Sequence, residues 1–159
     1  MSESERKQLI DRYEEGAQLF SDAVNSVPSH LIDIPPEPGK WSIRQIAHHT
    51  VDAEVVVSGR FRAVAGKNGS PLQAWDQDEW AVNLNYAKQP MEHVAPLFTL
   101  LRHTNASMLR ALPASAWEQH GEHPERGKQS LEDLLNLYIR HGESHARAIR
   151  EASRKPSAA

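Results

Sequence analysis

Two histidines spaced four residues apart, His141 and His145, lie in the segment LYIRHGESHARAIR. Residues four apart on a helix share one face, so both imidazoles could bind the same metal ion. The chain contains nine histidines, so such a pair also arises by chance, and a solvated or core-packed pair is the alternative. A second pair, His48 and His49, could supply a third ligand.

The absence of cysteine restricts the chemistry of any metal site. It excludes disulfides, thiolate ligands and cysteine nucleophiles. Three neutral imidazoles without a thiolate are typical of a catalytic site whose fourth coordination position stays open for water or substrate. Zinc and nickel are the ions we expect first, although iron and cobalt also accept nitrogen ligands. The residues thus predict one divalent metal ion per chain.

Carboxylates beside the histidines are candidates for a general base. Asp52 lies about one helical turn beyond His49 and could relay a proton from water at the metal, with a surface carboxylate as the alternative. We expect Glu54 to be solvated. Glu143 lies between the paired histidines, but a rotation of roughly 100° per residue directs it away from them. Asp52 is therefore the candidate catalytic residue.

Other polar and aromatic side chains could also face a substrate. His120 and His123 lie in a polar connection and are expected to be exposed rather than metal-bound. Trp75, Trp80 and Tyr86 could line a pocket or a dimer contact, or cover the core. Basic residues could contact an anionic substrate, although a solvated face is the expectation for this set: Arg60, Arg62, Lys67, Arg147 and Arg150.

Four amphipathic stretches must position these residues, because apolar side chains recur at intervals of three and four. The stretches cover residues 5–27, 42–64, 90–112 and 130–149. Ser42 with Gln45, and Ser130 with Asp133, are expected to cap the second and the last helix. Pro90 suits the first turn of the third helix.

The connections are polar or rich in proline. PSHLIDIPPEPGK after the first stretch must be extended, and residues 67–89 are irregular except for a short helix that DQDEWAVNLNYA could form. No segment shows the alternation typical of a strand. Four stripes that each need an apolar partner predict an all-α four-helix bundle with long connections after its first and second helices. We expect residues 1–159 to form a single domain.

Composition excludes several partners. The net charge of −3 gives no broad attraction for nucleic acid or an anionic membrane. No run approaches the roughly 20 apolar residues of a membrane-spanning helix, and the start MSESERKQLI does not resemble a signal peptide. We therefore expect a soluble cytoplasmic protein that acts on a small molecule, with no nucleic-acid or membrane partner.

Three blocks of the sequence resemble the DinB superfamily, specifically its YfiT-like branch of metal-dependent hydrolases. These are GKWSIRQIAHHTVDAE, WDQDEWA and EHPERGKQSLEDLLNLYIRHGESHARAI, within residues 39–149. The resemblance implies a four-helix bundle that holds a divalent metal through one histidine of the second helix and the pair in the last. Periodicity does not choose between His48 and His49. The family's first ligand falls eight residues after the tryptophan of its block, which is Trp41 here, and so corresponds to His49.

The resemblance also bears on the reaction. It implies a hydrolase in which a metal bound by His49, His141 and His145 activates water at its open position. Members of the superfamily are also thiol-dependent transferases or isomerases, so a thiol S-transferase is the first alternative. A non-catalytic bundle fastened by a structural metal is the second. A homodimer is compatible with the family.

Overall fold

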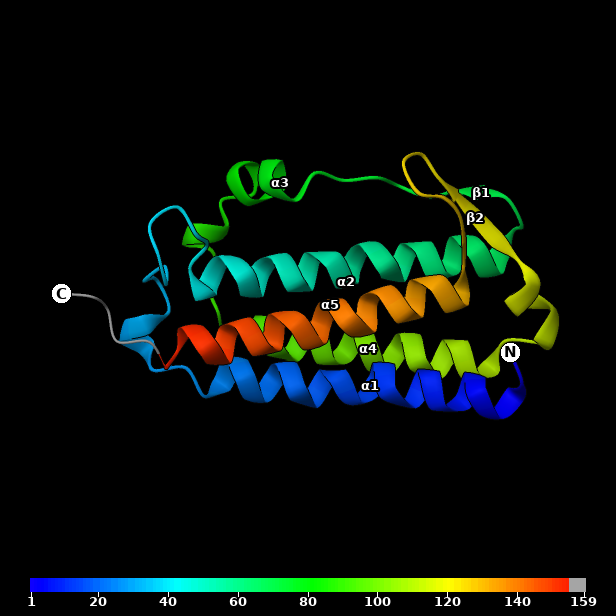
Figure 1. Cartoon of the computed structure of the whole chain (residues 1–159), viewed down its shortest axis with the longest axis horizontal. Coiled ribbons are helices and arrows are strands. Elements are labelled where there is room, and N and C mark those ends of the chain that lie inside the picture. Colours follow the sequence, from blue (N-terminus) through cyan, green and yellow to red (C-terminus); the bar gives the residue numbers. More distant parts are fainter. Residues whose placement is uncertain (155–159) are drawn as a thin grey trace.

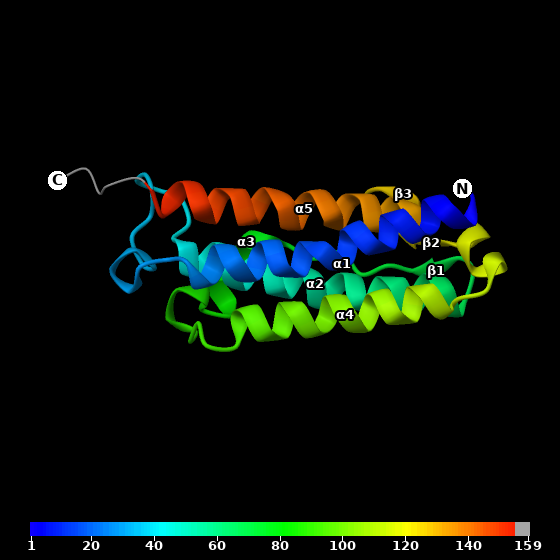
Figure 2. The same cartoon turned by 90° about the horizontal axis from the view of Figure 1, so that it is seen from below.

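Four long helices form the body of the protein, as the computed structural model shows for residues 1–154. Residues 155–159, which the expected domain includes, lie outside the described residues. The helices run side by side along the long axis (Figures 1 and 2) and are α1 (Glu3–Asn25), α2 (Ile43–Gly66), α4 (Val94–Ala111) and α5 (Leu131–Ala152). The predicted all-α four-helix bundle is confirmed.

In cross-section the four helices form a square. α1 and α2 occupy one diagonal of this square, and α4 and α5 occupy the other. α1 contacts α4 and α5 extensively, and α2 contacts the same two helices. Figures 1 and 2 show α1 and α2 on opposite sides of the bundle, with α4 and α5 between them. The chain must therefore cross the bundle end after α1 and again after α4. This arrangement explains the long connections after α1 and α4 and brings α2 directly against α5.

Local sequence signals set the helix starts that matter for the site. Ser42 and Gln45 form a reciprocal capping box at α2, and Ser130 and Asp133 form another at α5. Both were predicted. α4 begins at Val94, later than the expected start at Pro90, because a turn precedes it.

A small three-stranded sheet covers one end of the bundle, where no strand was expected. Its strands are β1 (Ser70–Pro71), β2 (His120–His123) and β3 (Gly127–Ser130). β1 pairs parallel with β2 through Ser70 and Gly121, and β2 pairs antiparallel with β3 through Gly121 and Gln129. The polar connection before α5 is thus a hairpin. Strands this short carry too few residues to display alternation.

The segment after α2 runs back along that helix (Figure 1) and ends in α3 (Gln77–Asn83), the predicted short helix. Short 3₁₀ helices complete the connections: η1 (Ser29–Leu31), η2 (Tyr86–Lys88) and η3 (Ala114–Glu118). The segment carries Trp75 over α2. Within residues 1–154, no helix combines the length and apolar character that crossing a membrane requires.

A buried ion pair lies in the middle of the bundle. Glu54 on α2 and Arg102 on α4 are each 1% exposed, and their Oε2 and Nε atoms are 3.1 Å apart. The expectation that Glu54 is solvated was wrong. Arg102 also donates to the backbone carbonyls of Tyr13 and Tyr138, both at 2.7 Å, so α1, α2, α4 and α5 meet at this one side chain.

Candidate metal centre

Three histidine side chains converge between α2 and α5. Nε2 of His49 lies 3.0 Å from Nε2 of His141, which lies 3.1 Å from Nε2 of His145. One nitrogen from each ring lies within 4.8 Å of the other two. Two ligands of a tetrahedral zinc ion, each about 2.0–2.1 Å from it, are about 3.3 Å apart. The three nitrogens therefore fit the donor set of a metal such as zinc.

Helix geometry accounts for the convergence. His141 and His145 are one turn apart on the face that α5 turns toward α2, and His49 faces them from the second turn of α2. Gly142 occupies the position next to His141 because a Cβ there would lie 2.6 Å from Nη2 of Arg102. The glycine of the HGESH segment thus leaves room for the buried guanidinium behind the histidines.

The other two candidates of α2 lie elsewhere. His48 stacks on Tyr86, with ring centroids 6.0 Å apart, and its Nε2 has no partner within residues 1–154. The Tyr86 hydroxyl donates to Asp52 at 2.5 Å. The structure therefore brings His49, and not His48, together with the pair on α5. The Asp52 carboxylate does not line the cavity beside the histidines. The catalytic role of Asp52 stays a prediction.

The three imidazoles are held in the neutral form. Burial and the neighbouring His145 lower the pKa of His49 to about 4. Burial, followed by His145 and His49, lowers the pKa of His141 to about 2, and burial also lowers the pKa of His145. A neutral imidazole is the form that binds a metal, so no proton has to leave these ligands near neutral pH.

Two tryptophans orient His49. Its ring centroid lies 5.1 Å from that of Trp41 and 5.4 Å from that of Trp75, with the Trp75 plane tilted by 23°. The Nδ1 atom of His49 is buried and has no hydrogen-bond partner within the described chain. A metal-binding histidine usually donates this second N–H to an acceptor. Here aromatic packing fixes the ring instead.

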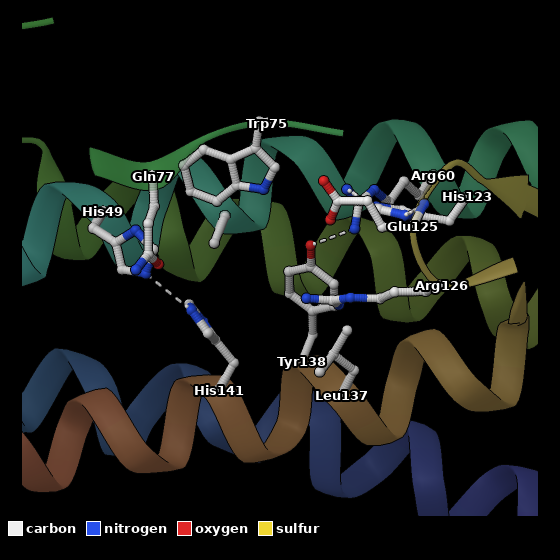
Figure 3. A pocket seen from close by; sticks show the side chains of 11 residues that line it. His49, Arg60, Trp75, Gln77, His123, Glu125, Arg126, Leu137, Tyr138 and His141 are labelled. Atoms are coloured by element: carbon white, nitrogen blue, oxygen red, sulfur yellow. Dashed lines mark hydrogen bonds between the residues drawn. The ribbon is translucent and has the colours of Figure 1, made fainter. Parts of the chain in front are cut away.

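A cavity of about 320 Å³ opens directly beside the histidines (Figure 3). It is bounded by α2, α5, the Trp75–Gln77 segment and the β2–β3 turn. Its lining residues are His49, Ala53, Arg60, Trp75, Gln77, His123, Glu125, Arg126, Leu137, Tyr138 and His141. In Figure 3, Trp75 and Gln77 extend from the segment above α2 toward His49 and His141. The cavity thus places a space for a ligand beside two of the three histidines, His49 and His141.

Arg60 and His123 form the other end of this cavity. The expectation that both are exposed was wrong, because Arg60 is only 4% and His123 only 5% exposed. Arg60 donates to the Gln73 carbonyl and to the Tyr138 hydroxyl, the latter at 3.1 Å, and contacts His123 at 3.2 Å. Arg62, by contrast, is exposed as expected. Burial lowers the pKa of Arg60 below its ordinary value.

Sequence reasoning missed several residues of the cavity wall. Gln77 and Arg126 lie within the blocks WDQDEWA and EHPERGKQ but were given no role, and Tyr138 was recognised only as part of an apolar stripe. The signal for Tyr138 was its position three residues before His141 on the same face. Glu143, expected to face away, does so and pairs with Arg12 of α1 through two 2.9 Å contacts.

Known proteins resemble this chain in sequence. The DinB superfamily pattern matches residues 12–149. A protein of Oceanobacillus iheyensis named "Putative metal-dependent hydrolase" is 26% identical over 136 residues, or 86% of this chain and 78% of that protein. One of Bacillus mycoides with the same description is 24% identical over 147 residues, 90% and 84% of the two chains.

A solved structure extends the likeness to the fold. It is that of YfiT from Bacillus subtilis, described as a "probable metal-dependent hydrolase with an unusual four-helix bundle topology". It matches with a TM-score of 0.88 over 97% of this chain and 89% of that chain, at 24% identity. The fold is thus that of YfiT, and because the sequence pattern spans most of the chain, the protein belongs to the DinB superfamily.

Proposed function

We propose that this protein is a metal-dependent hydrolase in which His49, His141 and His145 hold one divalent ion, zinc or nickel. The observation that carries the proposal is that three imidazole nitrogens meet at the end of a cavity. The relatives named as metal-dependent hydrolases support the same class of activity. A cavity of about 320 Å³ suits a small-molecule substrate.

The position of the cavity favours catalysis over a purely structural role. A divalent ion with three histidine ligands and a fourth position open to substrate activates water as a nucleophile and polarises a carbonyl. Because His49 and His141 belong to the cavity wall, a metal held by the three histidines would lie beside the space in which a substrate would bind. A closed structural site would need a fourth protein ligand. Within residues 1–154, the cluster contains three such groups.

Residues of the cavity wall can assist the reaction. The Tyr138 hydroxyl accepts a hydrogen bond from Arg60, and its own proton remains available to donate to a substrate carbonyl. Burial raises the pKa of Tyr138, so the hydroxyl stays protonated near neutral pH. Trp41 and Trp75 pack against the His49 ring, and Trp75 and Gln77 form part of the cavity wall beside it.

The first test is the metal content of protein purified without chelators, for the wild type and for alanine variants. We expect close to one zinc or nickel per chain, lost in His49→Ala, His141→Ala and His145→Ala. His48→Ala is the matched control, since it is the neighbouring buried histidine, and should keep the metal. Wild type that contains no metal and takes up neither ion would overturn the proposal.

The second test separates a catalytic from a structural metal. Cobalt replaces zinc in histidine sites and has a visible spectrum that depends on coordination. With an open position, azide or a small thiol should change this spectrum, and ester or amide hydrolysis should follow metal loading. A spectrum unchanged by added ligands, together with a large fall in melting temperature on metal removal, would indicate a structural site. Turnover that requires the thiol would identify a transferase instead.

A further inference from the structure

Arg60 is a buried cation without a buried anion. Its guanidinium has five N–H groups: two donate to the Gln73 carbonyl and one to the Tyr138 hydroxyl, and Nη2 also lies 3.2 Å from Nε2 of His123. None of these partners carries a negative charge. No carboxylate within residues 1–154 forms an ion pair with Arg60, although a buried charge is costly unless it is paired.

His123, beside Arg60, also has too few acceptors for the N–H groups around it. Its Nε2 lies 3.2 Å from Nη2 of Arg60, and its Nδ1 accepts the backbone N–H of Glu125 at 3.2 Å. A neutral imidazole accepts at one ring nitrogen only, so two donors cannot both be satisfied by this ring. Burial, with Arg60 and Arg126 nearby, lowers the pKa of His123 and keeps the ring neutral. One N–H in this contact therefore still needs an acceptor.

Arg126 brings a second cation to the same end of the cavity. Its side chain lines the cavity from the β2–β3 turn, is exposed, and has no hydrogen bond or ion pair within the described residues. Glu125 is the one carboxylate in the cavity wall. Two arginines and one glutamate leave a single positive charge at this end. That excess matches one monoanionic group better than a dianion, which Glu125 would repel.

We propose that Arg60 and Arg126 bind a carboxylate group of the substrate, at the end of the cavity away from the three histidines. The ligand class is a small carboxylic acid whose reacting ester, amide or thiol lies toward His49 and His141. A planar carboxylate accepts from guanidinium groups in pairs, and it would also accept the unsatisfied N–H between Arg60 and His123. The reaction at the other end rests on the proposed function, but carboxylate binding itself does not.

The first experiment measures ligand binding without turnover. Purified protein in low-salt buffer, with and without chelator, is titrated with hexanoate, with its neutral analogue hexanamide, and with inorganic phosphate. Trp75 lines the cavity, so tryptophan fluorescence reports occupancy, and calorimetry gives the dissociation constant. We expect hexanoate to bind at least tenfold more tightly than hexanamide or phosphate, whether or not chelator is present.

Variants then locate the bound carboxylate. Arg126→Gln changes an exposed side chain without a hydrogen bond, so it should fold normally and weaken hexanoate binding about tenfold. Lys128→Gln is the matched control, because Lys128 is an exposed cation of the same hairpin outside the cavity wall, and it should bind hexanoate as the wild type does. Arg60→Gln, checked for folding by circular dichroism, should lose the preference for hexanoate over hexanamide.

Three outcomes would overturn the inference. They are equal affinity for hexanoate and hexanamide, preference for phosphate, or an unchanged affinity in Arg126→Gln. Carboxylate binding that persists in His49→Ala, a variant without the proposed metal, would keep this inference even if the hydrolase proposal failed. In an active enzyme, Arg126→Gln should raise KM for a carboxylate-bearing ester about tenfold and leave KM for its neutral analogue unchanged.

Discussion

The two buried arginines of this protein lie in regions of opposite character. Arg102, at the centre of the bundle, pairs with Glu54 at 3.1 Å and donates to two backbone carbonyls. Arg60, beside the cavity, has only neutral partners. Both side chains are almost inaccessible, at 1% and 4%. Burial alone therefore does not distinguish a structural charge from one that awaits a ligand.

What distinguishes them is whether the surroundings complete their charge and hydrogen bonds. Around Arg102 the chain supplies an anion, the aromatic faces of Tyr13 and Phe98 at 4.4 and 4.7 Å, and a glycine on α5 that leaves space. Along the cavity it leaves three converging imidazoles and a cation without a counter-ion. The chain itself satisfies the charges of the closed interior, whereas the proposed metal and the proposed carboxylate would satisfy the groups of the cavity wall.

The largest expected loss of stability comes from breaking the buried ion pair between Glu54 and Arg102. Arg102→Met leaves Glu54 buried beside the Tyr13 hydroxyl without its cation, and we expect a loss of about 3–5 kcal/mol in the free energy of unfolding. Urea denaturation followed by circular dichroism measures it. The control is the double variant with Glu54→Leu, which removes both charges and should be more stable than Arg102→Met alone. Additive losses would contradict a coupled pair.

The second largest loss of stability is expected from a substitution of Gly142, the glycine that packs against Arg102. Gly142→Ala places a Cβ 2.6 Å from Nη2 of Arg102, and such overpacking costs about 1–3 kcal/mol. Gly59→Ala on α2 is the matched control, since nothing lies within 4 Å of its added Cβ. The control should gain up to about 1 kcal/mol from helix propensity. Equal effects in both variants, measured by thermal unfolding, would mean that Arg102 can move aside.

Acid should lower the free energy of unfolding of the metal-free protein, because buried histidines of the cavity wall must stay neutral in the folded chain. The pKa of His49 is lowered to about 4 in the folded chain, so between the ordinary value near 6.5 and pH 4 the unfolded chain binds more protons. Stability is therefore complete above pH 6.5 and falls as the pH drops below it. Between these two pH values, the free energy of unfolding falls by up to about 1.4 kcal/mol per pH unit for each such histidine. Urea titrations at pH 7.5 and 5.5 measure it, and His49→Ala should show a smaller difference.

The elements of the fold were predictable because their signals are local. The apolar spacing and the capping residues Ser42 and Ser130 identify α2 and α5 within a few residues. The short strands of the sheet were missed because four polar residues cannot show alternation. The pairing of β1 with β2, about 50 residues apart, depends on how the chain crosses the bundle end.

The candidate site was predictable only in part. The spacing of His141 and His145 identifies their common face, but His48 and His49 flank the apolar stripe equally, and only the resemblance favoured His49. The rotation of α2 against α5 decides between them, and this is a tertiary property. Glu54 carried an unused signal, since it lies four residues after Thr50 and three before Val57 and so falls within the buried stripe. Its partner Arg102 is 48 residues away in the sequence.

The smallest expected effect concerns the other arginine. Arg60→Met removes a buried cation without leaving an anion behind, so the lost hydrogen bonds are offset by the removed cost of burying a charge. We expect the free energy of unfolding to change by no more than about 1 kcal/mol, against about 3–5 for Arg102→Met. Added hexanoate should raise the melting temperature of the wild type and not that of Arg60→Met. A loss as large as that of Arg102→Met would show that Arg60 is a structural charge. Arg60 and Arg102 would then have the same role, and the contrast between the two regions would be wrong.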